Sequence, residues 1–151
     1  MSLREWLKNG WLVEHKPSRE EIADLMVVAD RDLHDCQAAG LSPDWRMNIA
    51  YNAALQLATI ALAASGYRAA REMHHYRTIH SLAFTLGLEK PVVAKLDKFR
   101  TKRNISDYER AFLTSEKEAG EMLALAQELR EKVIKWLGNK HPELSERSHD
   151  R

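Results

Sequence analysis

The chain has 151 residues, 30% of them charged, and a formal net charge of +1 at pH 7. A nearly neutral chain has no global positive field, so any contact with a nucleic acid must come from a local patch. The length suits one domain with a real hydrophobic core, and the small numbers of glycines and prolines, six and four, favour an all-α protein. The single cysteine, Cys36, excludes an intramolecular disulfide and fits a reducing cytoplasm. No segment resembles a signal peptide or a membrane span, so we expect a cytoplasmic protein without a membrane partner.

Residues 1–17 are expected to form an N-terminal arm. Ser2 is a candidate N-cap for a short helix over residues 2–9, and Gly10 is its stop signal. Trp6 and Trp11 make the arm hydrophobic enough to dock on the body of the protein or on a partner.

Apolar residues at three- and four-residue spacing predict a long helix over Ser18–Ala39, and Ser18 with Glu21 matches a capping box. A second helix is predicted over Pro43–Ser65, with Ser42 as N-cap and Gly66 as its stop. Alanine and leucine cover most of its circumference, which is typical of a central helix.

One polar stripe interrupts this central helix. Its four members recur at spacings of four, four and three: Asn48, Asn52, Gln56 and Thr59. A buried amide without a partner costs roughly 1–3 kcal/mol. The stripe therefore lines a polar site or a subunit interface, unless it faces solvent at the edge of the bundle.

A third helix is predicted over Ala69–Leu86, and three histidines lie on it: His74, His75 and His80. Glu72 and His75 form one Glu-x-x-His pair, the unit that di-iron bundles use twice. Because a second copy is absent from the sequence, we expect no metal site and no cofactor. A capping or packing role is the simpler reading of the histidines.

Pro91 opens a shorter helix over Val92–Arg103, and a strongly amphipathic final helix is predicted over Ser115–Leu137. Together these elements predict an all-α fold, an antiparallel four-helix up-and-down bundle with a short extra helix before the last long one. The bundle spans residues 18–138, and the polar residues 139–151 are expected to be a disordered tail.

The stretch Leu96–Phe112 concentrates polar chemistry at the end of the short helix. Its members include two guanidinium groups, an amide, a carboxylate and a phenol: Arg100, Arg103, Asn104, Asp107 and Tyr108. Arginine near a helix C-terminus is common, because it interacts favourably with the helix dipole. The stretch is therefore either a basic helix cap or a binding site.

Three stretches, in this order, resemble the HEPN superfamily (higher eukaryotes and prokaryotes nucleotide-binding domain). They are AYNAALQLATIALAASGYR at Ala50–Arg68, HHYRTIHSLAFTLG at His74–Gly87 and LDKFRTKRNISDYE at Leu96–Glu109. Many members of that family act beside a small nucleotidyltransferase in toxin–antitoxin pairs. The resemblance therefore implies a homodimer, a possible nucleotidyltransferase partner and a nucleotide or RNA ligand.

In ribonuclease members of the family, an arginine is followed after four to six residues by a histidine, and two such motifs meet across a dimer to cleave RNA without a metal. Arg103 matches the arginine and Asn104 fits a frequent following residue, but Tyr108 stands where histidine is expected. The unperturbed pKa of tyrosine, near 10, makes it a poor base at neutral pH. A histidine of the third helix would have to replace the missing one.

Three functions follow from this reading. The first is a dimeric HEPN-like module that binds a nucleotide, RNA or a partner through Arg100, Arg103, Asn104 and Asn52, with the three histidines nearby. The second is an active endoribonuclease toxin that uses Arg103, Asp107 and Tyr108 as catalytic groups, together with one of those histidines. The third is a structural helical adaptor whose basic helix end is only a cap.

Overall fold

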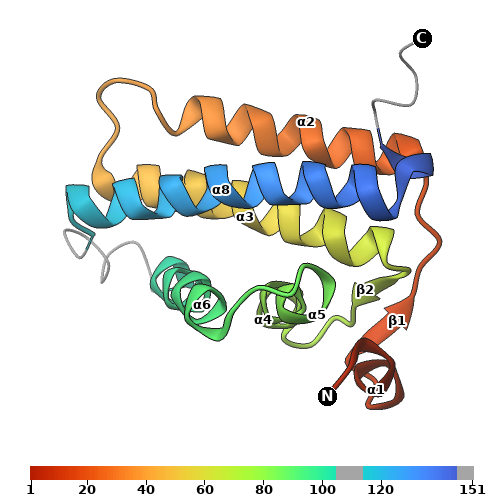
Figure 1. Cartoon of the computed structure of the whole chain (residues 1–151). Helices are drawn as coiled ribbons and strands as arrows, with labels where there is room; N and C mark the ends of the chain where they lie inside the picture. The colour runs from red at the N-terminus through yellow and green to blue at the C-terminus, as the bar shows by residue number, and fades with distance from the viewer. Residues whose placement is uncertain (105–113, 146–151) are drawn as a thin grey trace, which may run out of the picture.

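The computed structural model describes residues 1–104 and 114–145, and most of them are helical. Three long helices lie alongside one another: α2 (Arg19–Asp35), α3 (Pro43–Ala64) and α8 (Glu116–Lys140) (Figure 1). The predicted all-α character is confirmed at this level, and only two three-residue strands accompany the helices in the described residues.

The central position predicted for α3 is confirmed. Both α2 and α8 pack mainly against it and contact each other only slightly. Seven alanines of α3 belong to the core, together with large side chains such as Tyr51, Leu57 and Ile60. By length and composition α3 could cross a membrane, but 78% of its apolar window is buried inside the fold. Its hydrophobicity is thus accounted for by packing.

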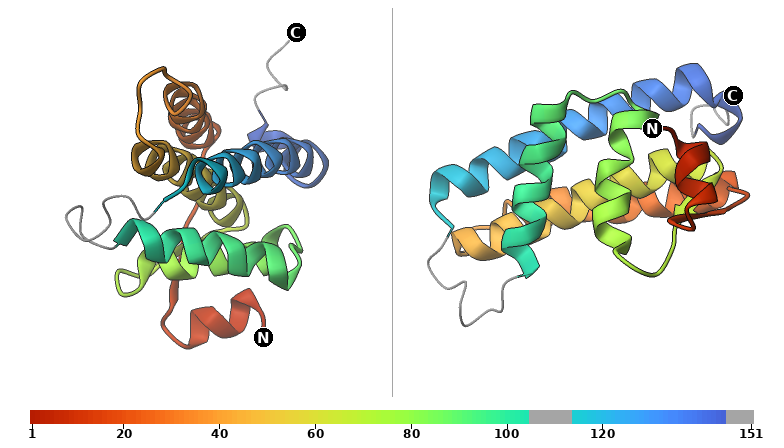
Figure 2. Two further views of the ribbon diagram at one scale, coloured as in Figure 1. Left: turned by 90° about the vertical axis from the view of Figure 1, so that its left-hand side faces the viewer. Right: turned by 90° about the horizontal axis from the view of Figure 1, so that it is seen from below.

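A second layer of shorter helices crosses α3 on the side away from α2 (Figure 2). This layer contains α4 (His74–His80), α5 (Leu82–Thr85) and α6 (Lys90–Asn104). Ile79 and Leu82 anchor its first part in the core, and Leu96 and Phe99, three residues apart, anchor α6. The crossing brings the polar ends of α4 and α6 over the middle of α3.

The N-terminal arm docks on the body of the protein. It contains α1 (Leu3–Lys8), capped by Ser2 as predicted, and the strand β1 (Leu12–Glu14). This strand pairs in antiparallel register with β2 (Tyr67–Ala69), Leu12 opposite Ala69. Trp6 is buried with Leu12, Leu62 and Ala69 in a small second core.

The continuous third helix predicted over Ala69–Leu86 is wrong. Ala69 belongs to β2, and Met73 has a left-handed backbone (φ 54°), so α4 begins only at His74. The chain then turns at Ser81 before the single turn of α5. Backbone pairing with the arm therefore outweighs the helix propensity of this segment, and α4 has only seven residues.

Two other boundaries differ from the prediction by more than two residues. The first long helix ends at Asp35, and Cys36 is its C-cap. The last one continues through Gly138 to Lys140, followed by the 3₁₀ turn η1 (Pro142–Leu144), whose Leu144 is buried. Residues 139–145 are thus ordered, contrary to the predicted tail, because Leu144 returns to the core.

Candidate functional site

A cluster of polar side chains lies where α4 and α6 cross α3. We call it the arginine cluster, and its members come from the three helices: Tyr51, Asn52, His75, Tyr76, His80, Asp97, Arg100 and Arg103. Its position follows from the periodicity of α6. Leu96, Phe99 and Arg103 are separated by three and four residues, so Arg103 continues the inward-facing row of α6.

Arg103 reaches from α6 to the central helix. Its Nε donates a hydrogen bond of 3.0 Å to Oδ1 of Asn52. Asn52 belongs to the polar stripe of α3, and both side chains are partly buried. This contact rules out the reading in which Asn52 simply faces solvent, and it ties the end of α6 to the core.

Arg100 is held in a different way. Its Nε donates to Oδ1 of Asp97 at 2.7 Å, and its guanidinium carbon lies 5.3 Å from the centre of the Tyr76 ring. The Tyr76 ring also lies close to that of His80, and the two ring centres are 4.2 Å apart. His80 Nε2 lies 3.4 Å from Asp97 Oδ1, an ion-pair distance for a protonated ring but without hydrogen-bond geometry.

Beneath the two arginines, the central helix presents Tyr51. Its side chain is fully buried, and its hydroxyl has no hydrogen-bond partner among the described residues. Burial raises the pKa of Tyr51 to about 12, although the positive charges of Arg100 and Arg103 act in the opposite direction. The phenol is therefore a neutral hydroxyl at pH 7, a hydrogen-bond donor rather than a base.

The surface above the cluster is a shallow depression. Its lining residues are Met73, His74, His75, Tyr76 and Arg100. His75 is exposed, yet partial desolvation lowers its pKa, and the positive charges of His74, Arg103 and Arg100 lower it further. A lowered pKa leaves His75 neutral at pH 7 and able to accept a proton.

The structure brings together most of the side chains that the sequence singled out. Asn52, His75, His80, Arg100 and Arg103 all belong to the cluster, and His74 lies at its rim. Asn104 is the last residue of α6. Asp107 and Tyr108 lie outside the described residues, so their predicted catalytic roles stay predictions.

The rest of the polar stripe has other surroundings. Asn48 is buried, and its Oδ1 has no hydrogen-bond partner within residues 1–104 and 114–145. Thr59 donates to the carbonyl of Leu55 in its own helix, which satisfies its hydroxyl locally. The stripe is thus not one site: Asn52 belongs to the arginine cluster, whereas Thr59 bonds within its own helix.

Sequence reasoning missed three members of the cluster. Tyr51 reads as one more core residue of an apolar helix, and its neighbour Asn52 was the only available signal. Tyr76 lies between two histidines, and Asp97 lies three residues before Arg100, the spacing of a helical ion pair. Tyr76 and Asp97 could therefore have been found from their sequence neighbours, whereas the approach of α6 to Tyr51 depends on tertiary structure.

Chemically, the fold and the cluster define a small helical domain with a basic, aromatic-lined polar site. At this site Arg100 pairs with the carboxylate of Asp97, and Arg103 donates to the amide oxygen of Asn52. No group of three or more histidine, cysteine or acidic side chains is placed to hold a metal ion within those same residues. No family model, no curated protein and no solved structure matches this chain.

Proposed function

We propose that the chain is a HEPN-like module that binds the phosphate of a nucleotide or of single-stranded RNA at the arginine cluster. The observation that carries the proposal is the placement of Arg100 and Arg103, three residues apart on α6, over Tyr51 and Asn52 of the central helix. A planar guanidinium can present two donors to two oxygens of one phosphate, which suits this role better than a lysine.

The aromatic neighbours add a second kind of contact. Tyr76 is partly exposed and lies at the edge of the depression next to Arg100. Bases of single-stranded nucleic acids stack on aromatic rings and on arginine planes, while their phosphates pair with cations. A site with both features beside one another accommodates a nucleotide more readily than an isolated phosphate ion.

A second candidate, an active metal-independent endoribonuclease, is favoured by one observation. His75 lies near both arginines and its lowered pKa keeps it neutral at pH 7. It is thus the histidine of α4 best suited to replace the one that the family motif lacks. As a general base it would take the proton of a ribose 2′-hydroxyl, while an arginine stabilises the charge on the phosphate.

The resemblance also supports proposals about assembly. In this view α4 and α5 together stand for the third helix of the four-helix bundle, and the protein is a cytoplasmic homodimer with a nucleotidyltransferase as a further partner. The exposed side chains of Val27 and Trp45 offer apolar surface for such contacts. A purely structural adaptor is the alternative in which the arginine cluster serves only to join α6 to α3.

Fluorescence anisotropy with a labelled single-stranded RNA oligonucleotide, with unlabelled ATP as competitor, tests the binding proposal. We expect saturable binding that weakens as the salt concentration rises, because phosphate contacts release counterions. Absence of binding to both probes at low salt would refute the proposal. Gel analysis of the same RNA after incubation with pure protein separates the two candidates, since only the nuclease shortens it.

A further inference from the structure

Aromatic rings and guanidinium groups alternate between the N-terminal arm and the arginine cluster. The guanidinium carbon of Arg77 lies 3.7 Å from the ring centre of Trp11 and 5.5 Å from that of Tyr76. Arg100 of the arginine cluster lies 5.3 Å from the same Tyr76 ring. We call these four residues the arm–cluster row: Trp11, Arg77, Tyr76 and Arg100. All four keep part of their surface in contact with solvent, so none of them is sealed in the core.

The fold places the row in one layer of the molecule. The helix α4 contacts both α6 and β2 and lies between them (Figure 1). The strand β1 pairs with β2, and the amide of Ala70 donates to the carbonyl of Trp11 at 2.9 Å. The chain after β2 is therefore held beside the arm, and the exposed Arg71 follows directly. Arg71 thus extends the row at its arm end.

Cations outnumber carboxylates in the segment that carries this end of the row. Residues 67–77 contain one carboxylate, Glu72, and three arginines: Arg68, Arg71 and Arg77. Arg68 and Arg71 are exposed, and none of the three arginines forms an ion pair with another residue in the described part of the chain. Such guanidinium groups can bind a phosphate without first giving up a carboxylate.

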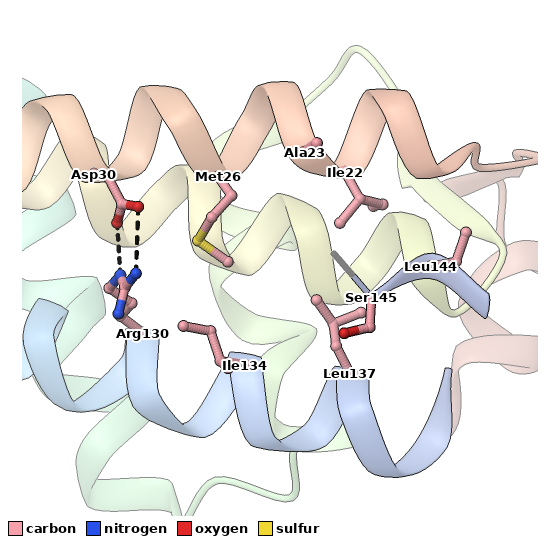
Figure 3. A pocket seen from close by; sticks show the side chains of 9 residues that line it. All are labelled: Ile22, Ala23, Met26, Asp30, Arg130, Ile134, Leu137, Leu144 and Ser145. Carbon is pink, nitrogen blue, oxygen red and sulfur yellow. Dashed lines mark hydrogen bonds and ion pairs between the residues drawn. The ribbon is translucent and has the colours of Figure 1, made fainter. Parts of the chain in front are cut away.

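The cleft between α2 and α8, on another side of the molecule, has a different character. Arg130 donates to both carboxylate oxygens of Asp30 at one end of it (Figure 3). The rest of its lining is mostly apolar. An anionic ligand would have to break this ion pair, so the distribution of free cations favours the arm–cluster row as the surface for a phosphate chain.

We propose that the arm–cluster row is a second nucleotide subsite, so that the ligand is a single-stranded oligonucleotide that reaches from the arginine cluster to Trp11. This inference rests on the proposed function of the arginine cluster. Bases stack on aromatic rings and on guanidinium planes, and cations pair with the phosphates between the bases. The second base stacks at Trp11 and Arg77, and Arg71 contacts its phosphate. An acidic peptide would use the cations but leave the rings without a stacking partner.

Fluorescence anisotropy of the full chain with a labelled oligoadenylate of about eight nucleotides tests the proposal. AMP, the dinucleotide and the tetranucleotide serve as unlabelled competitors. We expect the tetranucleotide to compete at least about tenfold better than AMP. If AMP competes as well as the tetranucleotide, the second subsite is refuted while the proposed function of the cluster stands. If no nucleotide binds, both are refuted. If polyglutamate binds as tightly as the oligoadenylate, the surface takes acidic chains in general, which also overturns the proposal.

Two variants locate the second subsite. Trp11→Leu keeps an apolar side chain but removes the ring, so tetranucleotide affinity should fall at least about fivefold and AMP affinity by less than about twofold. Arg71→Gln removes an exposed cation, so the slope of log affinity for the oligoadenylate against log salt concentration should become shallower by about 0.7, the value for one phosphate contact on a single strand.

Arg31→Gln, which removes an exposed arginine of α2, is the matched control and should leave affinity and slope unchanged. Circular dichroism melts show whether each variant is folded. Because Arg71 is exposed, its variant keeps the test decisive even if Trp11→Leu loosens the arm. A folded Arg71→Gln variant with the affinity and salt slope of the wild type would overturn the proposal.

Discussion

Arg103 and Asn52 lie 51 positions apart in the chain, and a hydrogen bond of 3.0 Å joins them. The bond connects the last turn of α6 to the middle of the central helix, and it fixes one edge of the guanidinium. An amide oxygen satisfies a donor without cancelling its charge. Arg100, one turn earlier on α6, donates instead to the carboxylate of Asp97.

The first prediction concerns the buried phenol of Tyr51. Because its pKa is raised to about 12, the folded state keeps this proton while the unfolded chain loses it near pH 10. This pKa difference contributes about 3 kcal/mol to the free energy of unfolding. The contribution is fully present below pH 10 and is lost as the pH rises through 12. A near-ultraviolet titration should show one late tyrosine that Tyr51→Phe removes and Tyr67→Phe does not. Ionisation of all tyrosines in one step near pH 10 would contradict this.

The second prediction concerns His75. Its pKa is lowered in the folded state, so the unfolded chain takes up a proton more readily as the pH falls below about 6.5. The free energy of unfolding should therefore decrease between pH 7 and pH 5, and His75→Gln should reduce this decrease. Urea unfolding at both pH values measures it, with His34→Gln, an exposed position on α2, as the matched control. A decrease identical in wild type and His75→Gln would refute the prediction.

The third prediction concerns the docking of the N-terminal arm. The guanidinium carbon of Arg77 lies 3.7 Å from the ring centre of Trp11 and 5.5 Å from that of Trp6. Arg77→Met should lower the free energy of unfolding by about 1 kcal/mol, the usual size of a partly desolvated cation–π contact. Tryptophan fluorescence and urea unfolding report it, and Arg71→Met serves as the exposed control. Equal stability of the two variants would mean that the contact does not hold the arm.

The long helices were predictable because their signals are local. Ser2, Ser18 and Ser42 all cap helices as predicted, and the apolar spacing predicts which faces are buried. The two strands were not predictable, because three residues such as Leu12–Glu14 are too few to show a period of two. Each strand exists only because the other is brought alongside it. Their pairing also explains why the predicted third helix starts late.

The site was predictable in part for the same reason. Arg100 and Arg103 drew attention as charges at a helix end, and Asn52 as a polar residue on an apolar helix. That these residues meet depends on the direction in which α6 crosses α3, and no local pattern encodes that direction. The ion pair between Asp30 of α2 and Arg130 of α8 joins residues 100 positions apart, so the sequence did not predict it either.

The most direct test of the proposed function is the substitution Arg103→Lys. Lysine keeps the positive charge but lacks the planar donor fork, so a charge-assisted contact of about 1.5–3 kcal/mol is lost. We predict that RNA or ATP binds at least about tenfold more weakly, while the melting temperature stays within about 3 °C of wild type. Lys98→Ala, which removes an exposed cation of the same helix, should leave affinity within about twofold. Binding by Arg103→Lys as tight as that of the wild type, with an unchanged melt, would contradict the phosphate-binding role of this cluster.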